Sequence, residues 1–125
     1  MTLKRPSSAL LLKGFLLLVG LLLASATAQA QEPSPLNRVD PVNVCMVNDR
    51  DMKAPQIPIP VGEKTYYGCC KMCVENIQQN EAPRYAVDPV SGKRVDKATA
   101  VIGARPDGQV FYFESEETFN KALER

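Results

Sequence analysis

The sequence predicts a small α+β domain made of two tandem β-hairpin-plus-helix halves that pack as one domain. Removing a leader of 30 residues from the chain of 125 leaves 95, which is enough for one small domain. Tyrosine- and phenylalanine-rich segments, which favour strands, precede two segments with helical spacing. The two parts also resemble each other at an offset of 46 to 48 residues.

Residues 1–30 have the pattern of a cleaved secretory signal peptide. A basic start precedes a leucine-rich run from Phe15 to Ala24. Ala28-Gln29-Ala30 is a small-x-small cleavage site before Gln31. The alternative is an uncleaved membrane anchor, but the leucine-rich stretch from Gly14 to Ala28 has only 15 residues and includes Ser25 and Thr27, whereas a spanning helix needs roughly 20. We therefore expect a secreted or periplasmic protein without stable membrane insertion after cleavage.

The first half of the domain contains the cysteines. Residues 31–42 are rich in proline and polar residues and are expected to form a flexible tether, followed by a domain at 43–125. Its first half, 43–87, is predicted to have strands at 44–47 and 63–67. Three prolines between them exclude a regular helix there. A helix from Cys70 follows, because apolar residues recur at helical spacing until Asn80.

The second half, 88–125, contains no cysteine. Strands are predicted at 97–104 and 109–113, joined by a turn at Arg105-Pro106-Asp107-Gly108. Ser115 has the position of a helix N-cap, and acidic residues follow it in the first turn, where the helix dipole favours them. We expect the apolar residues of this half to pack against the first half, namely Phe111, Phe113, Phe119 and Leu123.

The halves share a weak internal repeat. Asp40-Pro41-Val42 recurs as Asp88-Pro89-Val90, and the segment beginning at Gly62 aligns with the segment beginning at Gly108. Few identities support the alignment beyond these positions.

The stretch YYGCCKMC holds three of the four cysteines. Cys69 and Cys73 are four residues apart, so both thiols can project from one face of the first helical turn. Cys45, from the preceding strand, would add a third sulfur. Three thiolates form a soft site that suits Cu(I) or Zn(II). Cu(I) is slightly favoured because zinc usually needs a fourth ligand, which Cys70, an acid or water would provide.

Other roles for these cysteines remain open. Two disulfides are the default expectation for four cysteines in a small exported domain. However, adjacent cysteines, or cysteines three or four apart on a regular helix, bridge poorly. Cys70-Lys71-Met72-Cys73 is also a C-x-x-C sequence that could act in redox chemistry. Cys70 is expected to be either a weak auxiliary ligand or a small buried hydrophobic residue beside Val74 and Ile77.

The same residues resemble the TRASH and YHS metal-binding domains. Cys45 is followed after 23 residues by Cys69-x-x-x-Cys73, which comes after an aromatic strand. In the second half, DPVSGK is similar to the family's DPVCGM-type opening, and YFESEETF is similar to its YFCS-x-x-C segment. Ser91, Glu114 and Thr118 stand where that family has cysteines.

The resemblance spans about residues 40–123 and implies a treble-clef-like α+β unit. It also implies that the protein holds a heavy metal for trafficking, sensing or resistance, and that the second half is a degenerate copy. The ligands would be Cys45, Cys69 and Cys73, with Cys70 auxiliary. A metal transporter or metallochaperone would then be the expected partner.

Composition excludes several other functions. The mature chain would carry a net charge of −2, because all 14 acidic residues but only 12 of the 15 basic ones follow residue 30. No basic run is present, which argues against nucleic acid as a partner. The chain has no histidine and no phosphate-binding glycine loop. We therefore expect a metal-binding protein and not an enzyme, and the alternative is a disulfide-stapled interaction domain without metal.

Overall fold

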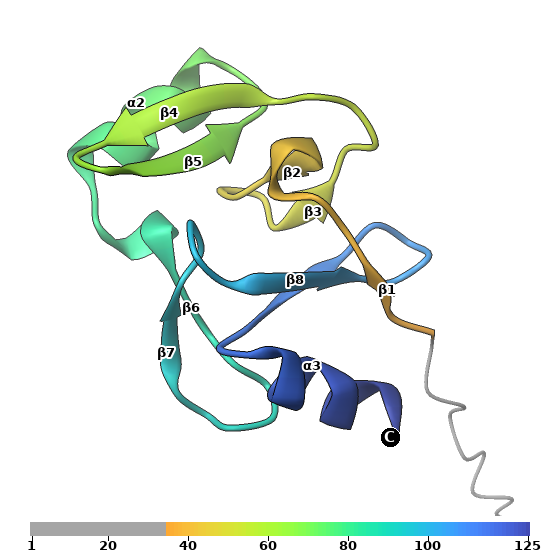
Figure 1. The fold of residues 1–125 in the computed structure, drawn as a ribbon. Coiled ribbons are helices and arrows are strands. Elements are labelled where there is room, and N and C mark those ends of the chain that lie inside the picture. Colours follow the sequence, from red (N-terminus) through yellow and green to blue (C-terminus); the bar gives the residue numbers. More distant parts are fainter. Residues whose placement is uncertain (1–34) are drawn as a thin grey trace, which may run out of the picture. The chain divides into compact units, whose positions relative to one another are not determined.

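The computed structural model describes residues 35–125. The predicted signal peptide and the start of the predicted tether lie outside the described residues. The predicted α+β class is confirmed: small antiparallel sheets combine with two helices, α2 (Lys71–Gln79) and α3 (Glu116–Leu123) (Figure 1). No helix in the described part of the chain is long and apolar enough to cross a membrane.

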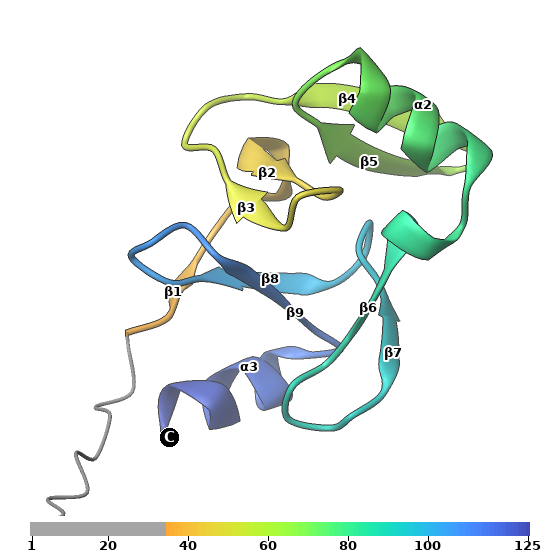
Figure 2. The same ribbon diagram turned by 180° about the vertical axis from the view of Figure 1, so that it is seen from behind.

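The first half contains a hairpin of β4 (Ile57–Val61) and β5 (Lys64–Gly68), and α2 packs against it (Figure 2). Gly62 lies in the hairpin turn with φ of 61°, a left-handed conformation that glycine adopts without steric cost. The prolines at 58 and 60 exclude a helix, as predicted, but they are accommodated in β4, which the sequence did not predict as a strand.

The second half repeats this arrangement. The strands β8 (Val101–Ala104) and β9 (Val110–Phe113) form a hairpin, and α3 follows β9. β1 (Asn37–Arg38) pairs with the free edge of β8 and completes a three-stranded sheet. β1 lies within residues 31–42, the segment that was expected to be a flexible tether.

Two smaller hairpins precede the larger ones. β2 (Val44–Cys45) pairs with β3 (Arg50–Asp51), and β6 (Tyr85–Val87) pairs with β7 (Arg94–Asp96). Short 3-10 helices, η1 (Pro41–Asn43) and η2 (Ala82–Arg84), lead into them. The expected strand at 97–104 begins only at 101, because residues 97–100 form a turn in which the Asp96 carboxylate accepts the Ala98 N–H.

A single core joins the halves. It includes Val44, Met46, Ile59, Tyr66 and Ile77 from the first half, and Val95, Ile102, Ala104, Val110 and Tyr112 from the second. Phe113 instead packs edge-on against Phe119 of α3, and Leu123 is half-exposed. Phe111 and Phe113 were expected to pack against the first half, but Tyr112 between them enters the shared core instead. Alternate residues of β9 face opposite sides of the sheet, so the expectation was off by one residue.

The two hairpins enter their helices in the same way. β5 is connected to α2 by two residues, Cys69 and Cys70. β9 is likewise connected to α3 by two residues, Glu114 and Ser115. Ser115 caps α3 by accepting the N–H of Thr118, whereas the Cys70 side chain makes no cap bond. Glu114 and Thr118 therefore occupy the positions of Cys69 and Cys73, at an offset of 45 residues, one residue less than the offset of 46 at which Gly62 aligns with Gly108.

A buried carboxylate fastens the start of α3 to the loop before it. Asp88 is fully buried, and its Oδ1 accepts the N–H groups of Val90 and Ser91 at 2.7 and 3.1 Å. Its Oδ2 accepts the N–H of Glu114 at 2.8 Å. Burial raises the pKa of Asp88, but the bonds from Glu114, Thr118, Val90 and Ser91 outweigh burial and hold the pKa below its usual value.

We predict that Asp88→Asn lowers the free energy of unfolding by about 2–3 kcal/mol at pH 7, because an amide cannot accept all these bonds. Because the folded-state pKa is depressed, the carboxylate's contribution is present above about pH 4 and is lost as the pH falls through the folded value. Urea denaturation at several pH values measures both effects.

The matched control is Asp40→Asn. Asp40 is exposed and accepts only the N–H of Val42, at 3.0 Å, so its replacement should cost under about 1 kcal/mol. Equal losses in the two variants, or a loss at Asp88 that does not shrink as the pH falls, would contradict the role given to Asp88.

Candidate metal centre

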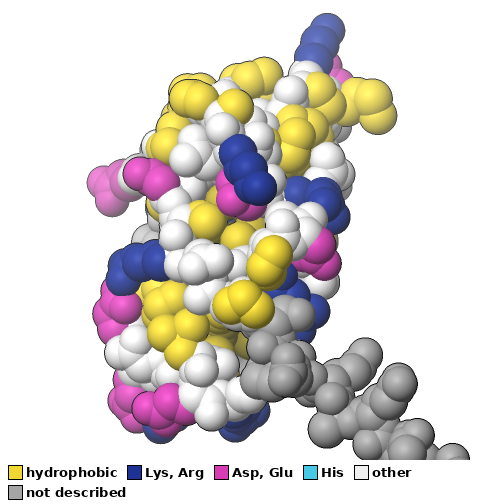
Figure 3. All heavy atoms as spheres, turned by 90° about the vertical axis from the view of Figure 1, so that its right-hand side faces the viewer, with side chains coloured by type: hydrophobic (Ala, Val, Ile, Leu, Met, Phe, Trp, Pro, Cys, Tyr) yellow, Lys and Arg dark blue, Asp and Glu magenta, His cyan; other side chains and the backbone are white. Residues whose placement is uncertain are grey.

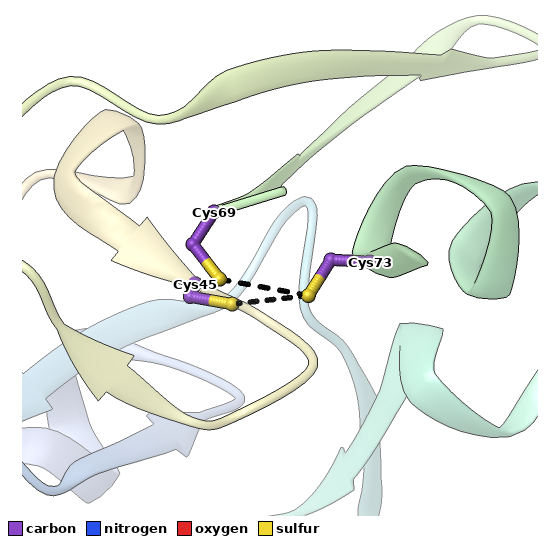
Figure 4. A group of neighbouring side chains, drawn as sticks. All are labelled: Cys45, Cys69 and Cys73. Carbon is purple, nitrogen blue, oxygen red and sulfur yellow. Dashed lines mark hydrogen bonds between the residues drawn. The ribbon is translucent and has the colours of Figure 1, made fainter. Parts of the chain in front are cut away.

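Three cysteine side chains converge from three separate parts of the first half. Cys45 ends β2, Cys69 lies in the connection between β5 and α2, and Cys73 is in the first turn of α2 (Figure 4). Their sulfur atoms all lie within 4.8 Å of one another. The three cysteines that the sequence singled out are therefore brought together at one place.

The spacing of the sulfur atoms matches that of metal-bound thiolates. Cys45 Sγ lies 3.8 Å and Cys69 Sγ 3.6 Å from Cys73 Sγ. Thiolates bound at about 2.3 Å from one ion stand about 3.8 Å apart in a tetrahedral site and about 4.0 Å apart in a trigonal one. All four cysteines of the chain are free in this structure, without a disulfide. The protein therefore presents a preformed soft ligand set, and a metal ion could be held without a large rearrangement.

Cys70 is not buried, so one of the two roles predicted for it is excluded. It is exposed, although its Sγ lies 3.5 Å from Cys73 Sγ. The helix begins one residue later than expected, so Cys70 is the N-cap with an extended backbone (φ −156°, ψ 171°) and leaves the apolar stripe. The expectation of a buried Cys70 was wrong. Cys69 also precedes the helix, so it meets Cys73 across the helix start and not along a helical face.

Despite burial, neighbouring backbone N–H groups lower the pKa of the Cys45 thiol. Burial raises the pKa of the Cys45 thiol, but N–H groups of Asn48, Cys69 and Val47 bond to the sulfur and bring the pKa below its usual value. Amide donors aimed at one sulfur stabilise the thiolate, which is the form that binds metal. The loop after β2 thus prepares Cys45 as a ligand.

The other two thiols of the cluster keep their protons more strongly. Burial is the main cause that raises the pKa of Cys73 to about 12, and hydrogen bonds with its cysteine neighbours add to it. The pKa of Cys69 is also raised, chiefly by its bond with Cys45. A metal that binds all three sulfurs must displace these protons, so binding would release protons to solvent.

A buried lysine from the second half fixes the loop that contains Cys45. Lys97 is 4% exposed, and its ammonium donates to the Met46 carbonyl at 2.7 Å and to the Asp49 carboxylate at 2.6 Å. Asp49 has a positive φ of 52°, so the loop reverses sharply at this residue. Lys97 therefore positions Cys45 without touching it.

Sequence reasoning missed three residues of the site. Lys97 gave no signal, because lysines are normally exposed. Asn48, whose Nδ2 lies 3.6 Å from Cys69 Sγ, stands three residues after Cys45, where a C-x-x-C zinc motif would have its second cysteine. Gly68 immediately precedes Cys69. A glycine at this place in the sequence could have indicated that the backbone approaches a neighbouring element closely.

Gly68 permits the contact between β5 and α2. A Cβ atom at this position would lie 2.9 Å from Cys73 Cβ and 3.1 Å from Ile59 Cδ1, which is closer than side chains pack. Glycine therefore lets the helix start approach the strand end, and this approach sets the distance between Cys69 and Cys73.

No family model, no curated protein and no solved structure matches the chain. The resemblance to TRASH and YHS domains therefore stays a prediction from the residues themselves.

On the face shown in Figure 3, acidic and basic side chains are interspersed among apolar ones.

We predict that Gly68→Ala weakens metal binding about tenfold or more, because a shift of α2 moves Cys73 relative to Cys69. Competition with a chelator of known affinity measures the change. Gly62→Ala is the matched control: it introduces strain at a positive φ, but nothing lies within 4 Å of the added methyl group. It should lower stability and leave metal affinity unchanged, and an equal loss of affinity in both would show that general destabilisation is responsible.

We predict that Lys97→Met lowers the free energy of unfolding by about 1–3 kcal/mol, because the Met46 carbonyl loses its partner. Metal affinity should fall as well, since the loop that contains Cys45 is released. Lys93→Met is the control, because the Lys93 side chain is 70% exposed and lies 3.4 Å from the Glu114 carboxylate in a surface ion pair. Urea denaturation and chelator competition on both variants test the prediction, which fails if Lys97→Met binds metal as tightly as the wild type.

Proposed function

We propose that this protein binds one soft metal ion through the thiolates of Cys45, Cys69 and Cys73. The observation that supports the proposal best is the cluster itself: three sulfur atoms from distant points of the sequence lie within 4.8 Å of one another. Two of these side chains are buried and the third is partly buried.

The ligand set limits the choice of metal. Thiolates bind Cu(I) and Zn(II) well and Mg²⁺ or Ca²⁺ poorly. The described residues offer three sulfurs in the cluster, and this number satisfies Cu(I), whereas zinc would recruit Cys70 or a water as a fourth ligand. Cu(I) is therefore slightly favoured over Zn(II).

The cellular role that fits this site is metal handling outside the cytoplasm. The signal-peptide pattern of residues 1–30 supports a secreted or periplasmic location. The resemblance to TRASH and YHS domains supports a role in heavy-metal trafficking, sensing or resistance, with a transporter or metallochaperone as partner. The site offers soft ligands, and this is the chemistry of metal storage and transfer, so we propose no enzymatic activity.

We predict that serine variants of Cys45, Cys69 and Cys73 each lose about 100-fold or more in metal affinity, because the remaining pair of thiolates leaves the site open. The reduced protein is titrated anaerobically in competition with a Cu(I) chelator and, separately, with a Zn(II) chelator. Cys70→Ser is the matched control in the Cu(I) titration, where it should stay within about threefold of the wild type.

Native mass spectrometry, before and after reduction, identifies the state of the four thiols. One added metal per chain supports the proposal. A mass lower by four hydrogens would indicate two disulfides. If the reduced protein also takes up no metal, the metal-binding proposal is wrong and the protein is a disulfide-stapled domain. Loss of binding in Cys70→Ser but not in Cys69→Ser would move the site to the C-x-x-C pair.

A further inference from the structure

A cleft opens from solvent onto the thiol cluster. It has a volume of about 360 Å³, and Cys73 is the one member of the cluster in its lining. The lining residues are Val47, Asn48, Cys70, Met72, Cys73 and Asn76. Cys45 and Cys69 do not line it, so an ion that arrives through this cleft meets Cys73 first.

Two exposed sulfur side chains line the same cleft. Cys70 is exposed because it is the extended N-cap of α2, and its Sγ is 3.5 Å from Cys73 Sγ. Met72 is 78% exposed, so its side chain is open to solvent at the cleft. A thiol and a thioether are both soft ligands, so the cleft presents the same chemistry as the cluster behind it.

Cys70 is close to the cluster without belonging to it. The three sulfurs that lie mutually within 4.8 Å are those of Cys45, Cys69 and Cys73, and Cys70 is outside that group. A bound ion would therefore exchange Cys70 for cluster thiolates when it moves inward. Such a ligand affects the rate of transfer more than the final affinity.

We propose that Cys70 and Met72 form an entry site that takes Cu(I) from a sulfur-ligated donor molecule and passes it to the cluster through Cys73. This inference rests on the proposed function and adds the route and the kind of donor. Met72 would hold the incoming ion weakly, and Cys70 would make the first strong bond.

The transfer is a series of ligand exchanges in which Cu(I) keeps its charge. First, a Cys70–copper bond forms while one donor thiolate–copper bond breaks, and the proton of the Cys70 thiol passes to the leaving thiolate. Next, a Cys73–copper bond forms and the Cys70–copper bond breaks, and the proton of Cys73 passes to Cys70. Cys45 and Cys69 then form bonds to copper while the remaining donor thiolate–copper bonds break, and the protons of these two thiols pass to the leaving thiolates. No oxidant or reductant is needed.

The test compares loading rate with equilibrium affinity. The reduced protein is mixed in a stopped-flow instrument with Cu(I) bound to glutathione, and the absorbance of the copper–thiolate bonds is followed. We expect Cys70→Ser to load about tenfold more slowly than the wild type and Met72→Leu to load a few-fold more slowly. In competition titrations, both variants should keep the wild-type affinity within about threefold.

Gln79→Ser is the matched control, because Gln79 is exposed on α2 outside the cleft. It should change neither rate nor affinity. Loading of Cys70→Ser at the wild-type rate would overturn the entry site and leave the cluster intact. A large loss of affinity in Cys70→Ser would also overturn it, because Cys70 would then be a permanent ligand. Failure of the wild type to take up Cu(I) while it binds Zn(II) would overturn the entry site alone, and failure to take up either metal would overturn the proposed function itself.

Discussion

The position of the thiol cluster depends on two adjacent residues of the second half, Asp96 and Lys97. Lys97 donates to the loop after Cys45, while the Asp96 carboxylate accepts hydrogen bonds from Tyr66 Oη at 2.9 Å and from the Lys64 ammonium. The first contact positions the loop containing Cys45, and the second fixes β5, the strand that leads to Cys69. Because both contacts start from one short segment, the cysteine-free half sets the relative positions of the ligands in the other half. Hydrogen bonds in which one partner is charged are stronger than those between neutral groups.

The two halves fasten a helix start to a preceding loop by different chemistry. In the second half the Asp88 carboxylate receives N–H groups from the loop and from Glu114, so the join is complete within the protein. In the first half the helix start and β2 present free thiols whose mutual contacts are weak. A metal ion bound there would supply what the carboxylate supplies in the second half. The join in the cysteine-free half is thus permanent, whereas a join through the thiols would depend on a bound ion.

Local sequence signals predicted much of the fold and the three cysteines that come together. Residues with strong local preferences, such as Ser115 at the N-cap and Gly108 with φ of 89°, are placed as expected, and the three clustered cysteines follow from their spacing. Features that depend on tertiary contacts were missed. Lys97 is buried only because two acceptors from distant residues meet it, and β1 is a strand only because β8 offers a free edge. The exposure of Cys70 depended on a shift of one residue in the helix start, and a sequence pattern does not define that boundary so closely.

The prolines of β4 have a consequence for self-association. β4 and β5 form a two-stranded sheet, so β4 has one edge without a neighbour. In an antiparallel ladder the N–H groups of alternate residues point to the same edge, and Pro58 and Pro60 are two residues apart with no N–H to donate. Because β4 stays paired with β5 over five residue pairs, the missing donors belong on its outer edge. That edge is a poor template for a strand from another copy, so the sheet next to the thiols is protected against edge-to-edge aggregation.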